Sequence, residues 1–346
     1  MSAATEPPLL EVRDLVQEFT VRDSSGARKL TVHALSGVSF ELNAGETLGI
    51  VGETGSGKST LARAILQSPR PKSGDVLLRG QSLVKLRGRQ LAQARRNIQM
   101  VFQDPFGSLD PTWRVSQIVE EPLVAFKIGD RDQRRKRVEE VLELAGLDPA
   151  RHARRRPREL SGGQAQRVAI ARALALDPAL IICDEAVSSL DVLIRAQVLN
   201  LFERLRSELK LSYLFIAHDL SLVKHVSDRV AVMYLGKLCE IGPATALYRQ
   251  PQHPYTVALL ASIPSPDPRA TPTELEATVH GEPASPIDPP SGCRFRTRCP
   301  RAQERCALEE PQLRMLGPDQ YAACHFPVSE PAPAAAIEAE PAASAQ

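Results

Sequence analysis

The eight residues from Gly52 to Ser59, Gly-Glu-Thr-Gly-Ser-Gly-Lys-Ser, limit the possible folds of this chain more than any other segment. Their spacing fits the phosphate-binding pattern G-x-x-x-x-G-K-[ST]. The apolar run from Glu46 to Val51 predicts a buried strand before the loop, and the spacing from Thr60 to Leu66 predicts a helix after it. A glycine-rich turn with a surface lysine is the alternative, but such a turn requires neither element. The segment therefore predicts an α/β fold with a nucleotide site at a strand–helix turn.

The residue types in this loop suit the binding of a nucleotide together with magnesium. Glycines allow backbone N–H groups to surround an anion, and the N-terminus of the following helix adds a partial positive charge. Lys58 is expected to reach the β- and γ-phosphates, and the Ser59 hydroxyl is expected to ligate Mg²⁺. The predicted phosphate-binding residues are Gly52, Gly55, Ser56, Gly57, Lys58, Ser59 and Thr60.

A second segment, Leu180–Glu185, predicts an apolar strand that ends in two carboxylates. Ligands of α/β proteins bind at the carboxyl ends of the strands, where these acids would lie. Asp184 is placed to hold Mg²⁺ through water, and Glu185 is placed to polarise the water that attacks the γ-phosphate. Many strands end in acids, so this segment carries weight only together with the phosphate loop.

Charge and hydropathy limit the class of protein. The chain has 346 residues with 43 basic and 41 acidic side chains, and its formal charge of +2 gives no field that favours a nucleic-acid partner. No apolar run approaches the ~20 residues of a membrane span, because charged residues and Pro178 interrupt the longest candidate, Val168–Cys183. The N-terminus has no basic region followed by an apolar core. We therefore expect a cytoplasmic location, where disulfides are rare.

The pattern of the sequence changes along the chain. Residues 10 to about 85 contain short apolar runs between turn residues and predict a β-rich region around the phosphate loop. From about 165 to 250, strands and helices alternate, which predicts parallel strands in a covered sheet. The last residues, 329–346, are rich in Ala, Pro and Glu and are expected to be disordered.

Residues 87 to about 160 have a helical pattern and many arginines. Val138, Val141, Leu142 and Ala145 form an amphipathic stripe in this region. The arginines are expected to form a solvated face rather than a binding patch.

A third motif, Leu160-Ser-Gly-Gly-Gln164, lies between the phosphate loop and the acidic strand. It precedes a predicted helix from Ala165 to Leu176, for which Ser161 is a suitable N-cap. The glycines leave the Ser161 hydroxyl and the following N–H groups open to a second anion. From the residues alone, a plain capped helix start is as well supported as an anion site.

The three motifs together resemble those of the ATP-binding cassette (ABC) family, and Leu160–Gln164 is similar to its signature. Gln103, within Met100-Val-Phe-Gln-Asp-Pro-Phe-Gly-Ser-Leu-Asp-Pro111, resembles the family's Q-loop. Ser189-Leu190-Asp191 resembles its D-loop, and His218 its switch histidine. Phe19 lies where the family usually has an aromatic residue that stacks on adenine; a core phenylalanine is an equally supported interpretation.

The resemblance covers residues 10 to about 250 and implies specific roles. It makes Glu185, His218 and Gln103 catalytic, with Ser59, Gln103 and Asp184 around Mg²⁺. It also implies that nucleotide contacts extend to Phe19, Ser161, Gly162, Gly163, Gln164 and Asp191.

The family's arrangement implies a head-to-tail dimer in which the phosphate loop of one cassette and the Ser-Gly-Gly of the other enclose ATP. ATP then stabilises the closed form, and hydrolysis releases it. One cassette alone is expected to hydrolyse ATP poorly. The chain departs from common family patterns after Glu185, where Ala-Val-Ser-Ser-Leu-Asp follows, and at Ala165, but neither departure changes a catalytic position.

The branch of the family is indicated by Phe102–Pro111, by Pro251-Gln-His-Pro-Tyr-Thr-Val-Ala-Leu-Leu260 and by the C-terminal cysteines. These resemble the ATPases of bacterial dipeptide/oligopeptide importers, some relatives of which carry nickel. The resemblance implies a second, usually non-identical ATPase subunit, two membrane permeases and, indirectly, an extracellular binding protein. It places the chain on the cytoplasmic face of the bacterial plasma membrane as a peripheral protein. The competing class is a soluble ABC ATPase of translation or DNA repair, which usually has two cassettes or a long coiled-coil insertion.

Four cysteines follow in a proline-bounded segment with spacings C-x₅-C-x₆-C-x₁₇-C: Cys293, Cys299, Cys306 and Cys324. Four thiolates suit zinc or an iron–sulfur cluster, although the spacings differ from those of common zinc sites. In the importer branch this segment resembles one that holds a [4Fe–4S] cluster, and we favour that cofactor over zinc and free thiols. His325 is a possible substitute ligand, whereas Cys183 and Cys239 have apolar neighbours and are expected to be buried.

The expected fold is therefore an ABC-type α/β nucleotide-binding domain with a β-rich subdomain, a RecA-like core and a helical subdomain at about 87–165. This domain is expected to cover residues 1–262. A small Cys-containing extension is expected at 263–327, and a disordered tail at 328–346.

Overall fold

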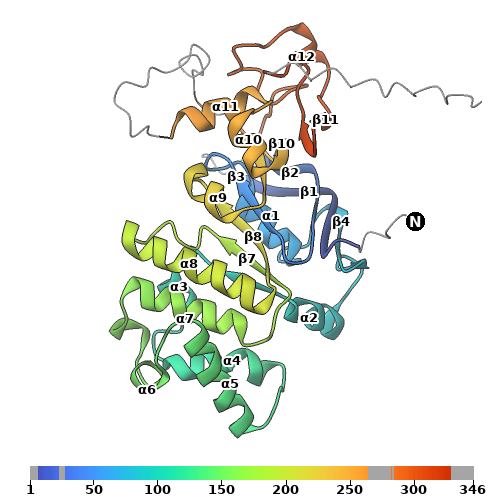
Figure 1. Ribbon diagram of the computed structural model, residues 1–346. Coiled ribbons are helices and arrows are strands. Elements are labelled where there is room, and N and C mark those ends of the chain that lie inside the picture. Colours follow the sequence, from blue (N-terminus) through green and yellow to red (C-terminus); the bar gives the residue numbers. More distant parts are fainter. Residues whose placement is uncertain (1–6, 23–27, 264–281, 283, 329–346) are drawn as a thin grey trace, which may run out of the picture.

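The computed structural model describes residues 7–22, 28–263, 282 and 284–328. Of the tail expected to be disordered, residues 329–346 lie outside these ranges. Figure 1 shows the sheets in the middle of the molecule, with helices α3–α8 below them and the C-terminal residues above. The strands are β1 (Leu10–Arg22), β2 (Lys29–Leu42), β3 (Thr47–Val51), β4 (Ser73–Leu78), β5 (Gln81–Ser82), β6 (Ile98–Val101), β7 (Leu180–Asp184), β8 (Ser212–Ala217), β9 (Arg229–Tyr234), β10 (Lys237–Pro243), β11 (Arg314–Gly317) and β12 (Gln320–Ala322).

The β-rich start of the chain forms a four-stranded antiparallel sheet in the order β2-β1-β4-β5. Its inner side chains, such as Leu10, Val12 and Val76, alternate with more exposed ones, as expected for a sheet with one covered face. Phe19 lies in β1 opposite Val32 of β2.

The second sheet has eight strands in the order β11-β12-β10-β9-β3-β8-β7-β6. Strands β6, β7, β8, β3 and β9 are parallel, which confirms the prediction for β7, β8 and β9. The prediction is wrong for β10, the last strand within residues 165–250, because a tight turn returns it antiparallel to β9. Its central strands are buried on both faces: Ile182 and Ile216 pack with the antiparallel sheet and α1, while Ile181 and Phe215 pack with the helices on the opposite face. This two-sided burial explains the continuous apolar runs in the sequence.

The helices are α1 (Lys58–Ile65), α2 (Gly88–Arg96), α3 (Pro105–Ser108), α4 (Val115–Ala125), α5 (Arg131–Leu144), α6 (Pro149–His152), α7 (Gly162–Leu174), α8 (Val192–Leu209), α9 (Leu220–Val226), α10 (Ala244–Arg249), α11 (Pro254–Ala261) and α12 (Glu304–Leu308). The predicted helices after the phosphate loop and after Ser161 are therefore present as α1 and α7. Helix α7 begins three residues earlier than expected, because Ser161 caps it directly. The predicted helical subdomain at 87–165 also contains β6, which belongs to the eight-stranded sheet.

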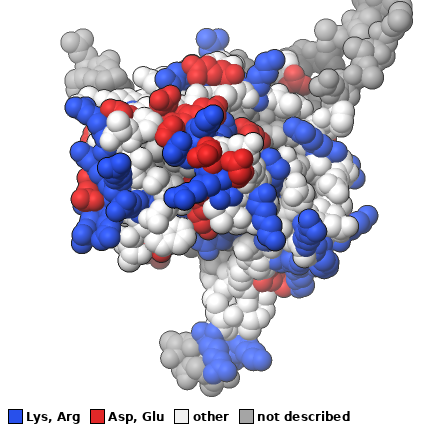
Figure 2. Space-filling model, turned by 90° about the horizontal axis from the view of Figure 1, so that it is seen from below, with Lys and Arg blue, Asp and Glu red and all other residues white. Residues whose placement is uncertain are grey.

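The arginine-rich region forms helices whose apolar stripe is buried and whose charged side chains are paired at the surface. Val138, Val141, Leu142 and Ala145 are all buried, as predicted from their spacing. Arg134 pairs with Glu120 at 2.9 Å, and Arg137 pairs with Glu140 at 2.9 Å. Figure 2, which views the molecule from this end, shows Lys and Arg beside Asp and Glu over much of the face. These contacts agree with a solvated, mixed-charge surface.

The C-terminal residues join the central sheet. Strand β12 pairs antiparallel with β10, and β11 pairs with β12. The Glu240 carboxylate of β10, which is fully buried, accepts hydrogen bonds from the backbone N–H groups of Gln252 and His253 and from the side chain of Gln320. The sequence did not predict these strands.

Helices that could cross a bilayer are absent from the described part of the chain, since none is both long and apolar enough.

Candidate nucleotide site

The phosphate loop connects β3 to α1 at the carboxyl edge of the parallel strands. Gly57 has φ +104° and lies directly before the helix, where a Cβ atom would come within 2.4 Å of the Ala34 carbonyl oxygen. Gly52 is equally confined, since a Cβ there would meet the Met233 carbonyl oxygen at 2.2 Å. The glycines of the motif are therefore required both for the backbone conformation and for close approach of neighbouring strands.

Lys58 is 4% exposed, and its ammonium group points back into the loop. It donates hydrogen bonds to the carbonyl oxygens of Gly52 at 2.7 Å and Glu53 at 3.0 Å, and contacts Ser56 Oγ at 3.4 Å. Burial lowers the pKa of the ammonium group, and the carboxylates of Glu185 and Asp184 oppose that shift. A buried cation with uncharged hydrogen-bond partners is well placed to gain energy from an incoming phosphate.

Asp184, the last residue of β7, lies beside the loop. The Ser59 hydroxyl donates a hydrogen bond of 2.9 Å to Asp184 Oδ1, so the two predicted magnesium ligands are in contact. Burial raises the pKa of Asp184, and the hydrogen bond from Ser59 opposes this rise. A hydroxyl and a carboxylate at one point of the sheet edge are oxygen ligands of the kind Mg²⁺ prefers. The donor set therefore fits a magnesium ion held together with a nucleotide.

Glu185 and His218 approach each other at the same edge. His218 Nδ1 lies 3.7 Å from Glu185 Oε2, which brings together the predicted base and the predicted switch histidine. Glu185 has φ +50°, a left-handed conformation that is uncommon for a side chain other than glycine. Its N–H donates to the Ile216 carbonyl oxygen at 3.0 Å, which holds the strained residue in place. Strain of this kind is concentrated at functional sites.

Gln103 follows β6 at this sheet edge, and its carbonyl oxygen accepts a hydrogen bond of 3.2 Å from Ser189 Oγ. The predicted Q-loop and D-loop are thus in direct contact. Asp191 caps α8 by accepting a hydrogen bond of 3.0 Å from the Ile194 N–H. Three aromatic side chains in the segment that follows β6, namely Phe102, Phe106 and Trp113, are 39–42% exposed.

Ser161 is the N-cap of α7 and forms a capping box with Gln164. Its Oγ accepts from the Gln164 N–H at 3.3 Å, while the Gln164 side chain accepts from the Ser161 N–H at 3.1 Å. Within the described residues, the hydrogen bonds of these side chains join Ser161, Gln164 and His152 and do not reach the phosphate loop. The capped helix start is therefore present.

Phe19 is 37% exposed on β1, so its ring is not a core side chain. This exposure favours the interpretation in which the ring is available to stack on a base.

The four C-terminal cysteines gather around one pocket, which they share with His253 and His325. The pocket has a volume of about 10 Å³, close to that needed for a single water molecule. Cys306 is buried and the others are half-buried; burial raises the pKa of Cys299 to about 11 and that of Cys324 to about 12. Within the ranges the structure describes, no group of three or more His, Cys, Asp or Glu side chains is arranged to hold a metal ion. The donor types fit a soft metal, but this arrangement does not form a site for one. Cys183 and Cys239 are buried in the core, as predicted.

Two further residues touch the phosphate loop, and the sequence did not reveal them. Tyr255 of α11 accepts a hydrogen bond of 2.9 Å from the Glu53 N–H. Arg298 donates to both carboxylate oxygens of Glu53, at 3.0 and 2.8 Å. These residues lie more than two hundred positions from Glu53 in the chain, so only the fold shows the contact.

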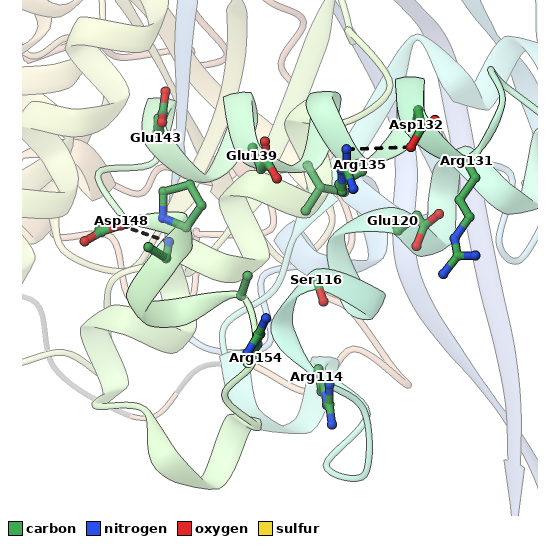
Figure 3. A pocket seen from close by; sticks show the side chains of 14 residues that line it. Arg114, Ser116, Glu120, Arg131, Asp132, Arg135, Glu139, Glu143, Asp148 and Arg154 are labelled. Carbon is green, nitrogen blue, oxygen red and sulfur yellow. Dashed lines mark hydrogen bonds and ion pairs between the residues drawn. The ribbon is translucent and has the colours of Figure 1, made fainter.

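A groove of about 1330 Å³ lies elsewhere, between α4, α5 and α6. Figure 3 shows acidic and basic side chains interleaved along it, among them Glu120, Arg131 and Arg135. It contains none of the predicted nucleotide-binding residues.

Comparison with known families gives two matches. The family described as "ABC transporter" matches residues 35–188, which contain the phosphate loop, the signature and the acidic strand. The family described as "Oligopeptide/dipeptide transporter, C-terminal region" matches residues 239–306, which include three of the four clustered cysteines.

Curated relatives match along nearly the whole chain. The oligopeptide transport ATP-binding protein AppF of Bacillus subtilis is 48% identical over 328 residues, covering 94% of this chain and 99% of the relative. The di/tripeptide transport ATP-binding protein DppF of Pseudomonas aeruginosa is 46% identical over 317 residues, covering 92% and 97%.

Solved structures agree with the fold. The ATP-binding cassette MJ0796, in a dimeric post-hydrolysis state with ADP and phosphate, superimposes with a TM-score of 0.60 at 29% identity. It covers 68% of this chain and 98% of the cassette. With matches of this extent to both families and relatives, the chain belongs to the ABC transporter family as an ATP-hydrolysing subunit of the branch that carries the oligopeptide/dipeptide transporter C-terminal region.

Proposed function

We propose that this chain uses ATP binding and hydrolysis to drive the import of dipeptides or oligopeptides through partner permeases. The nucleotide site rests on one observation: Ser59 with Asp184, and Glu185 with His218, meet at the sheet edge beside Lys58. The peptide cargo is supported by the relatives, which are peptide transport ATP-binding proteins at 46–48% identity.

In the proposed reaction, Lys58 binds the β- and γ-phosphates, helped by the N–H groups of the loop from Gly52 to Thr60. Mg²⁺ would be held by Ser59, Asp184 and Gln103 and would neutralise charge on the phosphates. Glu185 accepts the proton of the attacking water, and His218 holds Glu185 and the γ-phosphate in register. Phe19 stacks on the adenine ring.

The site is proposed to be complete only in a dimer. Ser161, Gly162, Gly163 and Gln164 at the start of α7 would contact the nucleotide bound to a second cassette, with Asp191 near the shared interface. The dimeric structure of MJ0796 supports this arrangement. The second cassette is proposed to be non-identical, as is usual for peptide importers.

Two membrane permeases and an extracellular binding protein are the further proposed partners, and the chain would bind the permeases at the cytoplasmic face of the membrane. Exposed Phe102, Phe106 and Trp113, in the segment that contains Gln103 and follows β6, offer apolar side chains for that contact. Closure of the nucleotide dimer would then move the permeases.

The test is a mild-detergent purification of the tagged protein from its native membranes, with identification of every copurifying chain by mass spectrometry. Two multi-span permeases and a second cassette are the expected partners. Recovery of ribosomal or DNA-repair proteins instead would move the assignment to the soluble class of ABC ATPases. Uptake of labelled dipeptides, longer peptides and nickel by cells with and without active protein would then define the cargo.

For the C-terminal segment, we propose a small Cys-containing extension over residues 263–327, following an ATPase domain at 1–262, in which four thiolates hold a [4Fe–4S] cluster or zinc. The gathering of Cys293, Cys299, Cys306 and Cys324 at one pocket supports this proposal. Occupation requires the thiols to rearrange, because within the described residues they form no group of three or more ligands placed to hold a metal.

Replacement of these four cysteines by serine is expected to remove bound metal while nucleotide binding is retained. Serine hydroxyls are poor ligands for soft metals. Metal content by elemental analysis, together with the visible absorption of a protein prepared without oxygen, distinguishes a cluster from zinc. Cys183→Ser is the matched control, since this thiol is buried elsewhere in the core. Metal retained by the fourfold variant would show that other residues bind it.

A further inference from the structure

Glu53 occupies an unusual position, because it is a carboxylate within a loop that must bind a polyanion. All three of its polar groups are engaged. Its N–H donates to the Tyr255 hydroxyl at 2.9 Å, its carbonyl oxygen accepts from Lys58 at 3.0 Å, and its carboxylate accepts two hydrogen bonds from Arg298. Of these partners, Arg298 forms the direct ion pair with the carboxylate.

Arg298 is fixed in place by the C-terminal segment. Its side chain is 11% exposed, and its guanidinium lies 5.8 Å from the ring centre of Tyr234 and 5.9 Å from that of Phe295. Phe295 is itself buried against Tyr234 and Tyr255. A planar guanidinium held on aromatic faces has little freedom, so the contact of its Nη1 group with both Glu53 carboxylate oxygens is pre-formed.

A second arginine of the same segment contacts the strands beside the loop. Arg294 donates to the Leu235 carbonyl oxygen and to Ser36 Oγ, the latter at 2.8 Å. Gly236, which follows Leu235 in the chain, donates its N–H to the Ser56 carbonyl oxygen of the phosphate loop at 2.8 Å. The C-terminal segment therefore supports the phosphate loop at two separate points.

Removing Arg298 would leave an unpaired, half-buried carboxylate in the loop that receives the phosphates. The freed carboxylate and the phosphates are both negative and repel each other, and this repulsion is stronger at a partly buried site than in water. The alternative partner for the freed carboxylate is Lys58, which lies in the same loop and is needed by the nucleotide. Either outcome weakens phosphate binding and leaves the groups that act on water, Glu185 and His218, unchanged.

We propose that Arg298 is a positioning residue for the nucleotide site: by neutralising Glu53, it keeps that carboxylate from repelling the phosphates and from pairing with Lys58. The C-terminal segment thus completes the ATP site of its own chain. This inference depends on the proposed role of residues 52–59 in binding phosphate, and it adds a long-range partner to that loop.

The test is a double-mutant cycle on Glu53 and Arg298 in the full-length chain. It measures the affinity for a fluorescent ATP analogue, and the KM and kcat of the assembled ATPase. We expect Arg298→Ala to raise Kd and KM by about tenfold, the size of one charge-assisted contact, with little change in kcat. Glu53→Gln alone should leave affinity within about threefold, because Arg298 remains. The double variant Glu53→Gln/Arg298→Ala should recover most of the affinity, because it removes the carboxylate that repels phosphate.

The recovery distinguishes charge neutralisation from a scaffolding role. If the double variant binds as weakly as Arg298→Ala, or if Arg298→Ala binds normally, the inference is wrong. Should the alanine variant fail to fold, Arg298→Lys and Arg298→Gln keep the side-chain stem: lysine should retain affinity and glutamine should lose it, and equal losses would contradict the proposal. Arg305→Ala is the matched control, because Arg305 forms an exposed ion pair with Glu309 at 2.8 Å in the same segment.

Failure of this inference and failure of the proposed function give different results. Normal nucleotide binding by Lys58→Ala would remove the phosphate-loop assignment itself. Loss of binding in Lys58→Ala with normal binding in Arg298→Ala would contradict only the role of Arg298.

Discussion

Lys58→Ala is expected to abolish productive ATP binding, because the phosphates lose the one buried ammonium group that lies within the loop. Lys58 is held at 2.7 Å from the Gly52 carbonyl oxygen, so the cation is already in place before a nucleotide arrives. Truncating one member of a buried charge pair costs about 2–5 kcal/mol, which predicts an affinity loss on the order of 10²-fold or more. Equilibrium binding of a fluorescent ATP analogue, with and without Mg²⁺, measures the effect.

The same substitution is not expected to destabilise the nucleotide-free protein severely. Burial lowers the pKa of Lys58, which means that the folded protein without ligand disfavours this charge. A thermal melt should therefore show a ligand-free Tm near that of wild type, together with the loss of the rise in Tm that ATP produces. Lys72→Ala is the control, since Lys72 is exposed and pairs with Glu18. Wild-type affinity in Lys58→Ala would contradict the assignment of the loop.

Glu185→Gln is expected to keep ATP binding but lower turnover by on the order of 10²–10⁴, if the carboxylate is the general base. Glutamine has a similar shape and cannot accept the proton of the attacking water. In the proposed cycle, ATP favours the closed dimer and hydrolysis reopens it, so the variant should accumulate as an ATP-bound dimer. Phosphate release and size-exclusion chromatography with ATP measure the two effects.

Asp184→Asn distinguishes the proposed role of Glu185 as general base from the proposed role of Asp184 as a Mg²⁺ ligand. Asp184 contacts Ser59 and is proposed to bind Mg²⁺, so its variant should lose the dependence of nucleotide affinity on Mg²⁺. In Glu185→Gln that dependence should remain. Unchanged turnover in Glu185→Gln would remove the residue from the chemical step.

Much of the nucleotide site could be predicted because its signals are local. The loop from Gly52 to Ser59 places glycines where a side chain would strike backbone atoms, and the acids of β7 follow a strand whose apolar run is evident. Strand–helix alternation then brings both to one sheet edge. The prediction of the buried stripe on α5 succeeded for the same reason, since its spacing repeats within one helix.

The parts of the fold and of the site that could not be predicted depend on contacts between segments far apart in the sequence. Arg298 reaches Glu53 across 245 positions, and nothing in its neighbourhood distinguishes it from Arg296 or Arg301. Strand β12 has three residues, too few for an alternating pattern to be recognised. The four cysteines line one pocket, but the sequence could not show how they are arranged there, and within the described residues that arrangement forms no metal site.

Strands β11 and β12 also have a consequence for how the protein can be handled. In a sheet ordered β12-β10-β9, they cover the side of β10 that would otherwise present unpaired N–H and C=O groups. Exposed strand edges recruit other chains and cause aggregation. A cassette shortened after α11 would expose this edge and leave the buried Glu240 without the Gln320 side chain. The C-terminal strands thus prevent self-association through the edge of β10. A shortened cassette is expected to lose solubility even though its nucleotide motifs are intact.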